Sequence, residues 1–261
     1  MPTLPKLPIS ALILAKNEQD MISGCLEQLD FVEEIIILDQ KSEDNTVEIA
    51  KKYTDKVFTS SNEDFGKNRT LLAQYAKGEW LLYLDCDERL SKDNLEEIAL
   101  KITQSENSAY YFPRKNFILS REVKHGGWWP DYVPRLFKKS NLKKWSGRVH
   151  ESPVIDGKFG YMKNPITHHT ARSINLMLAK SIKWAKIEAE LRFEANQPKV
   201  TILKTVKAIF LEFINRYFAK MAFLDGAVGV IESVYQGLHQ AMIMTYLWEL
   251  QNKTELENMS K

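Results

Sequence analysis

Short apolar runs alternate with helical patterns in the N-terminal third of the chain. Successive runs start 24, 22 and 24 residues apart, a spacing that is typical of strands joined by covering helices. The runs are Ser10–Ala15, Glu34–Asp39, Lys56–Thr59 and Trp80–Asp85. Apolar residues at helical intervals between the runs would face the sheet: Met21, Ile22, Cys25, Leu26 and Leu29 in one segment, and Leu71, Leu72, Tyr75 and Ala76 in another. The pattern predicts a doubly wound α/β domain with a mostly parallel sheet.

The C-terminal third has the pattern of long helices. A stretch from about Ala171 to Asn196 contains neither Gly nor Pro, and Gln197-Pro198 ends it. The apolar side of this first helix would carry Ile174, Leu178, Ile182, Ala185 and Ala189. The stretch from Ala227 to Trp248 is long enough to cross a bilayer, but it contains Glu232, Gln236, His239 and Gln240. This polarity argues against a membrane span.

The helix between these two is amphipathic and basic. Between Lys199 and Lys220 the chain carries five positive charges and one negative charge. One side of the helix would carry Leu203, Val206, Phe210, Phe213 and Tyr217. Such a helix either packs on the core or lies in a membrane interface, and the sequence leaves both readings open.

The composition, 44% hydrophobic and 27% charged over 261 residues, is that of a globular protein with a full core. We expect a catalytic domain over residues 1–170 and a helical, membrane-associated region over 171–261. Cys25 and Cys86 have no partner at metal-ligand spacing, and the prolines near the N-terminus interrupt any apolar stretch of signal-peptide type. We therefore expect reduced thiols and a cytoplasmic location.

The small net charge of +2 conceals an uneven distribution along the chain. Residues 1–108 hold 12 Lys/Arg and 21 Asp/Glu, a net charge of −9, whereas residues 109–172 hold 13 and 4, a net charge of +9. We expect the basic insert, about 109–170, to be either a solvated face or the surface that receives a phosphorylated partner.

Acidic residues follow the buried run Trp80–Leu84. Asp85 and Asp87 would share a face if the chain stays extended, while Cys86 would point away. Two close carboxylates repel each other unless a cation lies between them, and a divalent ion that also holds phosphate oxygens is a common solution. The acids could instead simply precede the helix that begins near Ser91.

Three polar segments are expected to meet at one edge of the sheet. The common strand order 3-2-1-4 brings the first and fourth strands together, with the ligand crevice at their carboxyl ends. Asn17 and Glu18 then face Asp85 and Asp87, and Asp39 opens onto the same edge. No Gly-x-Gly-x-x-Gly and no Gly-Lys-Ser/Thr loop is present, so the dinucleotide and P-loop readings fail.

Four segments carry a family resemblance: Ala15-Lys-Asn-Glu18, Leu38-Asp-Gln-Lys-Ser-Glu-Asp-Asn-Thr46, Gly66-Lys-Asn-Arg-Thr70 and Leu84-Asp-Cys-Asp-Glu-Arg89. In this order and spacing the chain resembles the family 2 glycosyltransferases, which have the GT-A fold. Within that family it is similar to bacterial enzymes that add glucose to the heptose of the lipopolysaccharide core. The likeness continues through Arg135-Leu-Phe137, Trp145, Val149-His-Glu151 and Phe223-Leu-Asp-Gly226. Lys41 departs from the pattern, because a glycine is usual there.

The resemblance implies a UDP-sugar donor and Mg²⁺ or Mn²⁺ as cofactor. It assigns the nucleobase and ribose to the first loop and to the acid after the second strand, here Ala15, Asn17, Glu18 and Asp39. It assigns the metal and the diphosphate to Asp85 and Asp87. Lys67 and Arg69 could contact donor phosphate or ribose, or could form a solvated first helical turn. His168 is a further candidate metal ligand, although adjacent His side chains diverge and one of His168 and His169 could be purely structural.

The basic insert supplies candidates for acceptor binding and catalysis. Trp128 and Trp129 beside Gly-Gly and Pro suit a surface that stacks on sugar rings, and Arg135 and His150 are counted with them. An inverting transfer needs a base for the acceptor hydroxyl, for which Glu151 is the first candidate and Asp131 the second. Glu151 could instead pair with Arg148, and His150 could be a core histidine.

The sequence therefore predicts an inverting, metal-dependent glycosyltransferase that moves a hexose, glucose in the first instance, to a lipid-linked saccharide. It would act on the inner face of the cytoplasmic membrane, with no nucleic acid as partner. Two alternatives are a sugar-1-phosphate nucleotidyltransferase, which should show a Gly-rich, Arg-containing first loop, and a non-enzymatic carbohydrate-binding protein on the membrane, which would not need Asp85 and Asp87.

Overall fold

The computed structural model describes residues 6–104, 106–147 and 151–253, and these divide into two compact units. The first unit comprises residues up to Arg114 together with Asp131–His168, and the second comprises Lys115–Pro130 together with the chain from His169 onward. The strands are β1 Leu7–Ala15, β2 Val32–Asp39, β3 Val57–Thr59, β4 Trp80–Asp85, β5 Glu88–Arg89, β6 Ala109–Ile118, β7 Arg121–Val123, β8 Asp131–Lys138, β9 Leu142–Ser146, β10 Ser152–Ile155, β11 Phe159–Tyr161 and β12 Ile166–Ala171. The helices are α1 Ile22–Leu26, α2 Thr46–Ala50, α3 Phe65–Tyr75, α4 Lys92–Gln104, α5 Ile174–Glu194, α6 Ile202–Ile214 and α7 Gly226–Gln251. Three short helical turns complete the set: η1 Lys139–Asn141, η2 Asn215–Ala219 and η3 Ala222–Asp225.

The sheet of the first unit confirms the predicted strand order. Its strands follow the order β3-β2-β1-β4-β8-β6-β12-β5, and the four N-terminal strands pair in parallel. From β8 onward the sheet continues with antiparallel pairs, which the basic insert supplies. The sheet is thus of the doubly wound type that the sequence predicts, and the C-terminal helices α5, α6 and α7 follow it in the chain.

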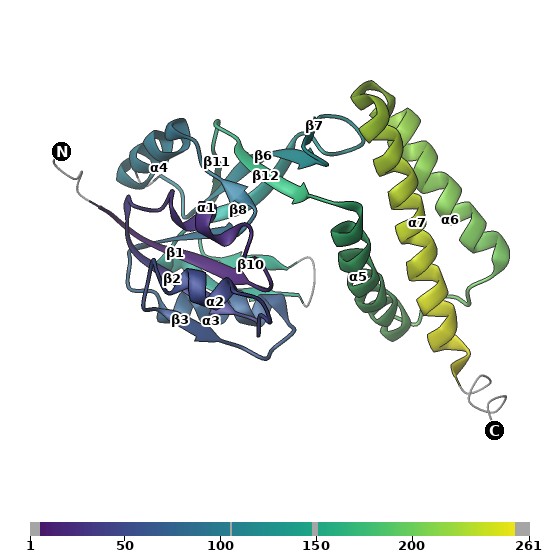
Figure 1. Cartoon of the computed structure of the whole chain (residues 1–261), viewed down its shortest axis with the longest axis horizontal. Helices are drawn as coiled ribbons and strands as arrows, with labels where there is room; N and C mark the ends of the chain where they lie inside the picture. The colour runs from purple at the N-terminus through teal and green to yellow at the C-terminus, as the bar shows by residue number, and fades with distance from the viewer. Residues whose placement is uncertain (1–5, 105, 148–150, 254–261) are drawn as a thin grey trace. The chain divides into compact units, whose positions relative to one another are not determined.

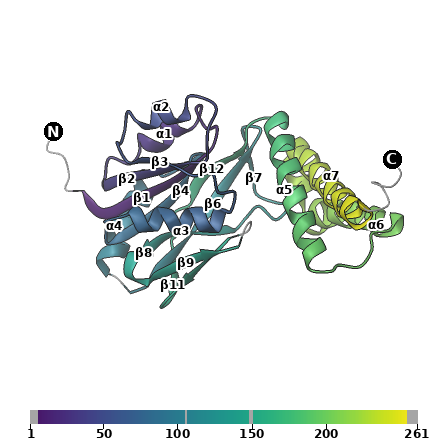
Figure 2. The ribbon, with the colours of Figure 1, turned by 90° about the horizontal axis from the view of Figure 1, so that it is seen from below.

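β4 lies at the centre of two apolar clusters, as its sequence predicts. Trp80, Leu82 and Leu84 enter one cluster, and Leu81 and Tyr83 enter the other, because successive side chains of a strand point to opposite faces. Helices α1, α2 and α4 cover the first face, and α3 covers the second; α3 lies across the sheet from α1 and α2 in Figure 2. Both faces of the sheet around β4 are therefore buried.

A buried carboxylate, Glu34, joins three segments at the amino ends of the strands. It accepts hydrogen bonds from the Ser10 hydroxyl and from the backbone N–H of Lys77, and it pairs with Lys56. Gly78 must be a glycine for the chain to pass here, because a Cβ at this position would lie 2.6 Å from the Ser10 nitrogen. Glu34 therefore ties the start of the fourth strand to the first two strands.

The pKa of Glu34 predicts an acid-labile fold. Burial would raise this pKa, but the hydrogen bonds from Lys56, Ser10 and Lys77 outweigh burial and lower the pKa to about 2. A carboxyl with a depressed folded-state pKa contributes stability above about pH 4.5 that is lost as the pH falls toward 2. After a discount for solvent screening, we expect the ionised Glu34 to contribute on the order of 1–2 kcal/mol to the free energy of unfolding. In Glu34→Gln, the free energy of unfolding measured with urea should depend less on pH between pH 5 and 2 than in the wild type. The substitution Glu33→Gln at the exposed neighbouring position should leave this pH dependence unchanged. The same pH dependence in both variants would contradict this role of Glu34.

The second unit packs α7 against both α5 and α6 (Figure 1). The predicted α5 helix is present, but of its predicted apolar side only Ala185 and Ala189 are buried. Ile174 and Ile182 are exposed, and the buried side is formed by Met177, Ser181, Ala185 and Ala189. A stripe of small residues allows α7 to approach closely, and Tyr235 of α7 bonds both the Ser181 hydroxyl and the Met177 carbonyl.

Asp225 connects segment 115–130 to the C-terminal helices. Its carboxylate accepts hydrogen bonds from the backbone N–H groups of Lys124 and His125, at 3.0 and 2.8 Å, and bonds the His125 ring at 2.7 Å. Arg216 adds a bond to the Gly126 carbonyl at 3.0 Å. The motif Phe223-Leu-Asp-Gly226 therefore has a structural purpose, since it caps a loop that lies far away in the sequence.

Candidate active site

The loops after β1 and β2 form one hydrogen-bonded platform. Asn17 stands at a left-handed φ of 54°, and its side chain accepts from the backbone N–H of Glu43 at 2.8 Å while its own N–H donates to Ser42. The backbone N–H of Glu18 donates to Thr46 at 2.8 Å. Lys41 has a φ of 56°, the conformation that a glycine would adopt most easily. The departure at Lys41 therefore leaves the left-handed loop in place.

Asp39 carries an open hydrogen-bond position within this platform. It ends β2 directly beside Ala15, its register partner at the end of β1, and it is 2% exposed. One carboxylate oxygen accepts from the N–H of Ser42 at 3.0 Å, and the other is buried without a partner among the described residues. Buried acceptors are nearly always paired in folded proteins. Asp39 is therefore suited to accept a donor group from a ligand.

Asp85 lies between two guanidinium groups at the end of β4. Arg69 of α3 donates to one oxygen at 2.9 Å, and Arg135 of β8 donates to the other. Burial would raise the pKa of Asp85, but the charges of Arg135 and Arg69 outweigh burial and hold this pKa well below its usual range. Burial would lower the pKa of Arg135, but the charges of Asp85 and Glu88 outweigh burial and raise this pKa above its usual value. Asp85 is therefore a fixed anion.

Glu88 is a site residue that the sequence reading did not single out. Its side chain is fully buried; it accepts from Arg135 at 2.6 Å and from the backbone N–H of Asp85 at 3.2 Å. Arg114 approaches it at 3.5 Å and pairs with Asp131 at 2.7 Å. Glu88 thus fixes the strand end that carries Asp85. The sequence signal that could have identified Glu88 as a site residue is its place within the Asp-Cys-Asp-Glu motif.

Glu151 joins the same network through Arg69. Arg69 Nε donates to Glu151 at 2.7 Å, so one guanidinium connects Glu151 to Asp85. The Arg69 group also lies 5.2 Å from the ring of Trp145, which is buried in the core. Arg148, the alternative partner for Glu151, lies outside the described residues, as does His150. The two base candidates therefore pair with different arginines, Glu151 with Arg69 and Asp131 with Arg114.

Asp87 and His168 form a second polar pair. Asp87 follows β4 in a turn, and its carboxylate lies 3.5 Å from Nε2 of His168, in β12. No group of three or more His, Cys, Asp and Glu side chains arranged to hold a metal ion occurs within the described ranges. Mg²⁺ is commonly held by one or two carboxylates together with substrate phosphates, so this small donor set fits a metal that arrives with a diphosphate.

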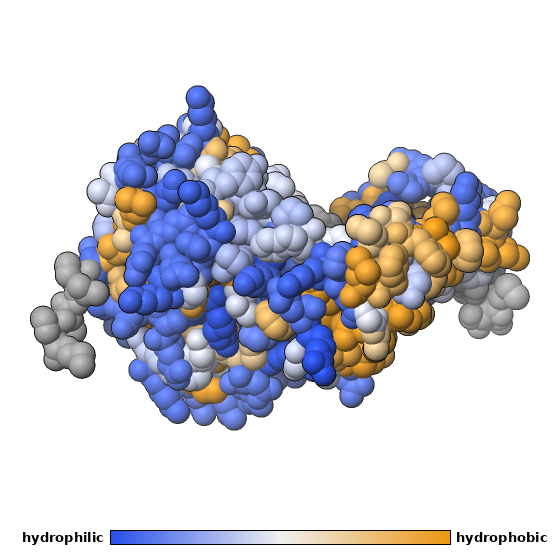
Figure 3. All heavy atoms as spheres, turned by 90° about the horizontal axis from the view of Figure 1, so that it is seen from above, coloured by the Kyte–Doolittle hydropathy of each residue, from blue (hydrophilic) through white to orange (hydrophobic). Residues whose placement is uncertain are grey.

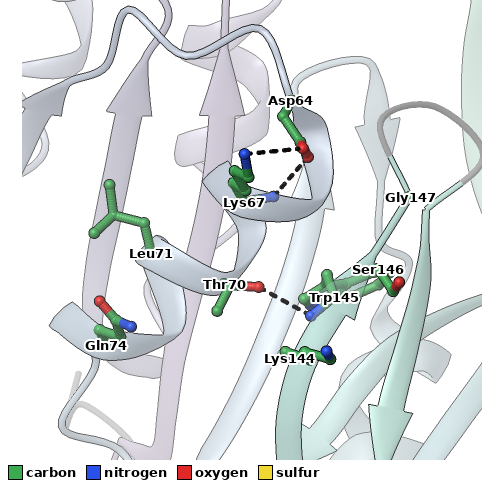
Figure 4. Close-up of a pocket in the computed structure, with 9 residues that line it drawn as sticks. All are labelled: Asp64, Lys67, Thr70, Leu71, Gln74, Lys144, Trp145, Ser146 and Gly147. Atoms are coloured by element: carbon green, nitrogen blue, oxygen red, sulfur yellow. Dashed lines mark hydrogen bonds and ion pairs between the residues drawn. The ribbon is translucent and has the colours of Figure 1, made fainter.

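Lys67 lies on a different side of α3 from the carboxylate network. Together with Thr70 and Gln74 it lines a pocket of about 480 Å³ that Lys144 and Trp145 of β9 also border (Figure 4). Its side chain is 73% exposed and lies 3.8 Å from Asp64, the residue that caps α3. Of the two predicted α3 cations, Arg69 is thus part of the network, and Lys67 is solvated.

The aromatic acceptor candidates fall in the second unit. Trp128 packs against the apolar cluster of that unit, whereas Trp129 is 45% exposed. Arg135, which the sequence groups with them, belongs to the first unit and is 4% exposed in the Asp85 network. Arg135 therefore has a defined structural partner, and its part in acceptor binding stays a prediction.

Comparison with known families decides the class of protein. The family described as "Glycosyl transferase family 2" matches residues 10–169, more than half of the chain. The chain belongs to glycosyltransferase family 2. This match covers every candidate site residue named above and shows that the protein is a glycosyltransferase.

Individual relatives of this family 2 glycosyltransferase are distant. The lipopolysaccharide core biosynthesis glycosyltransferase LpsC of Rhizobium meliloti is 23% identical over 244 residues, covering 88% of each chain. The glycosyltransferase SunS of Bacillus subtilis is 28% identical over 211 residues, which cover 73% of this chain and 47% of SunS. Among solved structures, S. aureus TarS 1-349 matches 94% of this chain and 91% of its own with a TM-score of 0.44 and 14% identity.

Proposed function

We propose that this enzyme transfers a hexose, glucose in the first instance, from a UDP-sugar to a lipid-linked saccharide such as the lipopolysaccharide core. The observation that carries the donor side of the proposal is the buried, unpartnered oxygen of Asp39 at the meeting point of β1 and β2. An N–H of a uracil ring or a hydroxyl of a ribose would satisfy it. The similarity to LpsC, by its name a lipopolysaccharide core enzyme, supports the acceptor class.

The proposed reaction inverts the anomeric centre and depends on a divalent metal. Asp87 and His168 would hold Mg²⁺ or Mn²⁺, which would neutralise charge on the departing diphosphate. Glu151 would take the proton of the acceptor hydroxyl as that oxygen attacks the anomeric carbon. Arg69 would orient Glu151, to which it donates a hydrogen bond at 2.7 Å. Ala15, Asn17 and Glu18 would line the nucleoside pocket beside Asp39.

The two alternative functions have lost support. A sugar-1-phosphate nucleotidyltransferase and a non-enzymatic carbohydrate-binding protein both fall outside the family to which the chain belongs. The proposed place of action is the inner face of the cytoplasmic membrane, with the protein bound peripherally. None of the helices in the described part of the chain combines the length and the apolar character that a membrane crossing needs.

Thermal-shift measurements with nucleotide sugars test the donor. UDP-glucose with Mn²⁺, at about 100 times its Kd, should stabilise the fold by about 2.7 kcal/mol. For a protein of this size the melting temperature would rise by about 5–10 °C. GDP-sugars, and UDP-glucose with EDTA, are the controls. A larger shift with GDP-mannose than with any UDP-sugar would show that the proposed donor class is wrong.

A further inference from the structure

Helix α6 is apolar on more of its circumference than its packing uses. On one side Ile209 lies against Gly237 of α7, and the half-buried Phe213 stacks on Tyr217 at a ring separation of 5.3 Å. A second side, here called the outer face of α6, is exposed. It consists of Leu203, Val206, Phe210 and Leu211, continued by Phe218 of η2, with 78%, 57%, 62%, 51% and 55% of their surface accessible.

Other parts of the second unit expose apolar side chains as well. Figure 3 shows apolar residues gathered over the C-terminal helices, in contrast to the largely polar surface of the other unit. Val230, Ile231, Val234 and Leu238 of α7 are exposed as well. Large exposed apolar surfaces mark interaction sites.

The charges beside the outer face of α6 identify its partner. Lys204 and Lys207 lie on the exposed side of α6, with Lys199 before the helix and Lys220 after it. None of these four lysines forms an ion pair with a described residue, and the only acid between them, Glu212, is neutralised by Arg216 at 2.6 Å. Two copies pairing through this face would bring like charges together, whereas anionic phosphates would be complementary to it.

We propose that the outer face of α6, flanked by its lysines, binds a bilayer surface that contains anionic lipids. At 13 residues α6 is about 20 Å long, too short to cross the roughly 30 Å hydrocarbon core, so it would lie in the plane of the interface. Phe210 and Leu203 would enter the acyl boundary, and Lys204 and Lys207 would extend toward the headgroups. This inference rests on the proposed function in one respect, namely that the acceptor is lipid-linked.

Vesicle co-sedimentation of the full chain tests the inference. The wild type should bind phosphatidylcholine vesicles that contain phosphatidylglycerol, and should bind pure phosphatidylcholine much more weakly. Phe210→Ser should weaken binding about tenfold or more, because it removes one of the largest side chains inserted in the interface. Lys207→Gln should weaken it about fivefold and reduce its salt dependence. Leu100→Ser and Lys52→Gln, at exposed positions in the other unit, are the matched controls and should bind as the wild type does.

A second variant separates membrane binding from folding. Phe213→Ser removes a half-buried side chain that stacks on Tyr217 and should lower the melting temperature, while Phe210→Ser, at an exposed position, should leave it unchanged. A Phe210→Ser variant that melts as early as Phe213→Ser would mean that the protein itself covers this face and would overturn the inference. Two further results would overturn the inference. One is wild-type protein that does not bind anionic vesicles, and the other is a wild-type dimer in analytical sedimentation that becomes monomeric in Phe210→Ser.

The inference and the proposed function fail separately. UDP-glucose with Mn²⁺ reports on the donor site in the absence of lipid, and vesicles report on α6 in the absence of donor. Vesicle binding by a chain that no UDP-sugar stabilises would contradict the proposed donor and would still support membrane binding through α6. Stabilisation by a UDP-sugar in a chain that binds no vesicle would support the proposed donor and would contradict membrane binding through α6.

Discussion

Glu151→Gln is expected to lower kcat for sugar transfer by about 10²–10⁴-fold, the usual contribution of a positioned general base. Glutamine keeps the size of the side chain and can still accept a hydrogen bond from Arg69, which donates to Glu151 at 2.7 Å in the wild type. It cannot take the acceptor proton. The loss should therefore appear in kcat, and the donor Kd from UDP titration should barely change.

Asp131→Asn is the matched control for Glu151→Gln. Both carboxylates pair with an arginine of the same network at 2.7 Å, so both substitutions remove a comparable ion pair. If Asp131 serves only to hold Arg114, its variant should keep kcat within about tenfold of the wild type. The reverse ranking of the two variants would make Asp131 the base, and equal activity in both would place the base elsewhere in the chain.

Asp87→Asn should abolish the stabilisation by UDP that depends on Mn²⁺ and reduce kcat/KM by about 10³-fold, the several kcal/mol that a bound metal supplies. The carboxylate of Asp87 lies 3.5 Å from the imidazole of His168, and asparagine keeps the size of the side chain, so the fold without ligand should melt near the wild-type temperature. His168→Ala should act in the same direction if the imidazole completes the metal shell.

Asp85→Asn provides the contrast to Asp87→Asn. Arg69 and Arg135 both donate to Asp85, and removing its charge would leave two buried cations poorly compensated. We expect a destabilisation of about 3 kcal/mol, measured by urea unfolding without any ligand. Unchanged UDP binding in the presence of Mn²⁺ by Asp87→Asn would refute the metal site, whatever Asp85→Asn does.

The parallel part of the fold could be predicted from the sequence because its signals are local. Each of the first four strands is an apolar run that ends near a polar turn, and β4 was predicted at its observed bounds, Trp80–Asp85. The order of the strands followed from the handedness of the crossovers. Asp39 and Asp85 could be expected at one edge for the same reason, and they end strands that flank β1 on either side.

The carboxylate–arginine network could not be predicted, because its members come from distant segments. Arg69, Glu88 and Arg135 belong to a helix and two strands, and no periodicity in the sequence relates them. The prediction for α5 was wrong at Ile174 and Ile182 for a related reason. Hydropathy ranks Ile182 above Ser181, but the close approach of α7 selects the smaller side chain, and Tyr235 then satisfies the Ser181 hydroxyl.

The capping of residues 124 and 125 by Asp225 sets an order of events during synthesis. The acceptor for the backbone N–H of His125 lies 100 residues further along the chain and is therefore synthesised later. At about 5–20 residues per second, the ribosome needs roughly 5–20 s to deliver Asp225 after it has made His125. During that interval segment 115–130 has been synthesised, but its capping residue and α7 have not. A chaperone that binds nascent chains would therefore find this aromatic segment, with Trp128 and Trp129, accessible before any other part of the second unit.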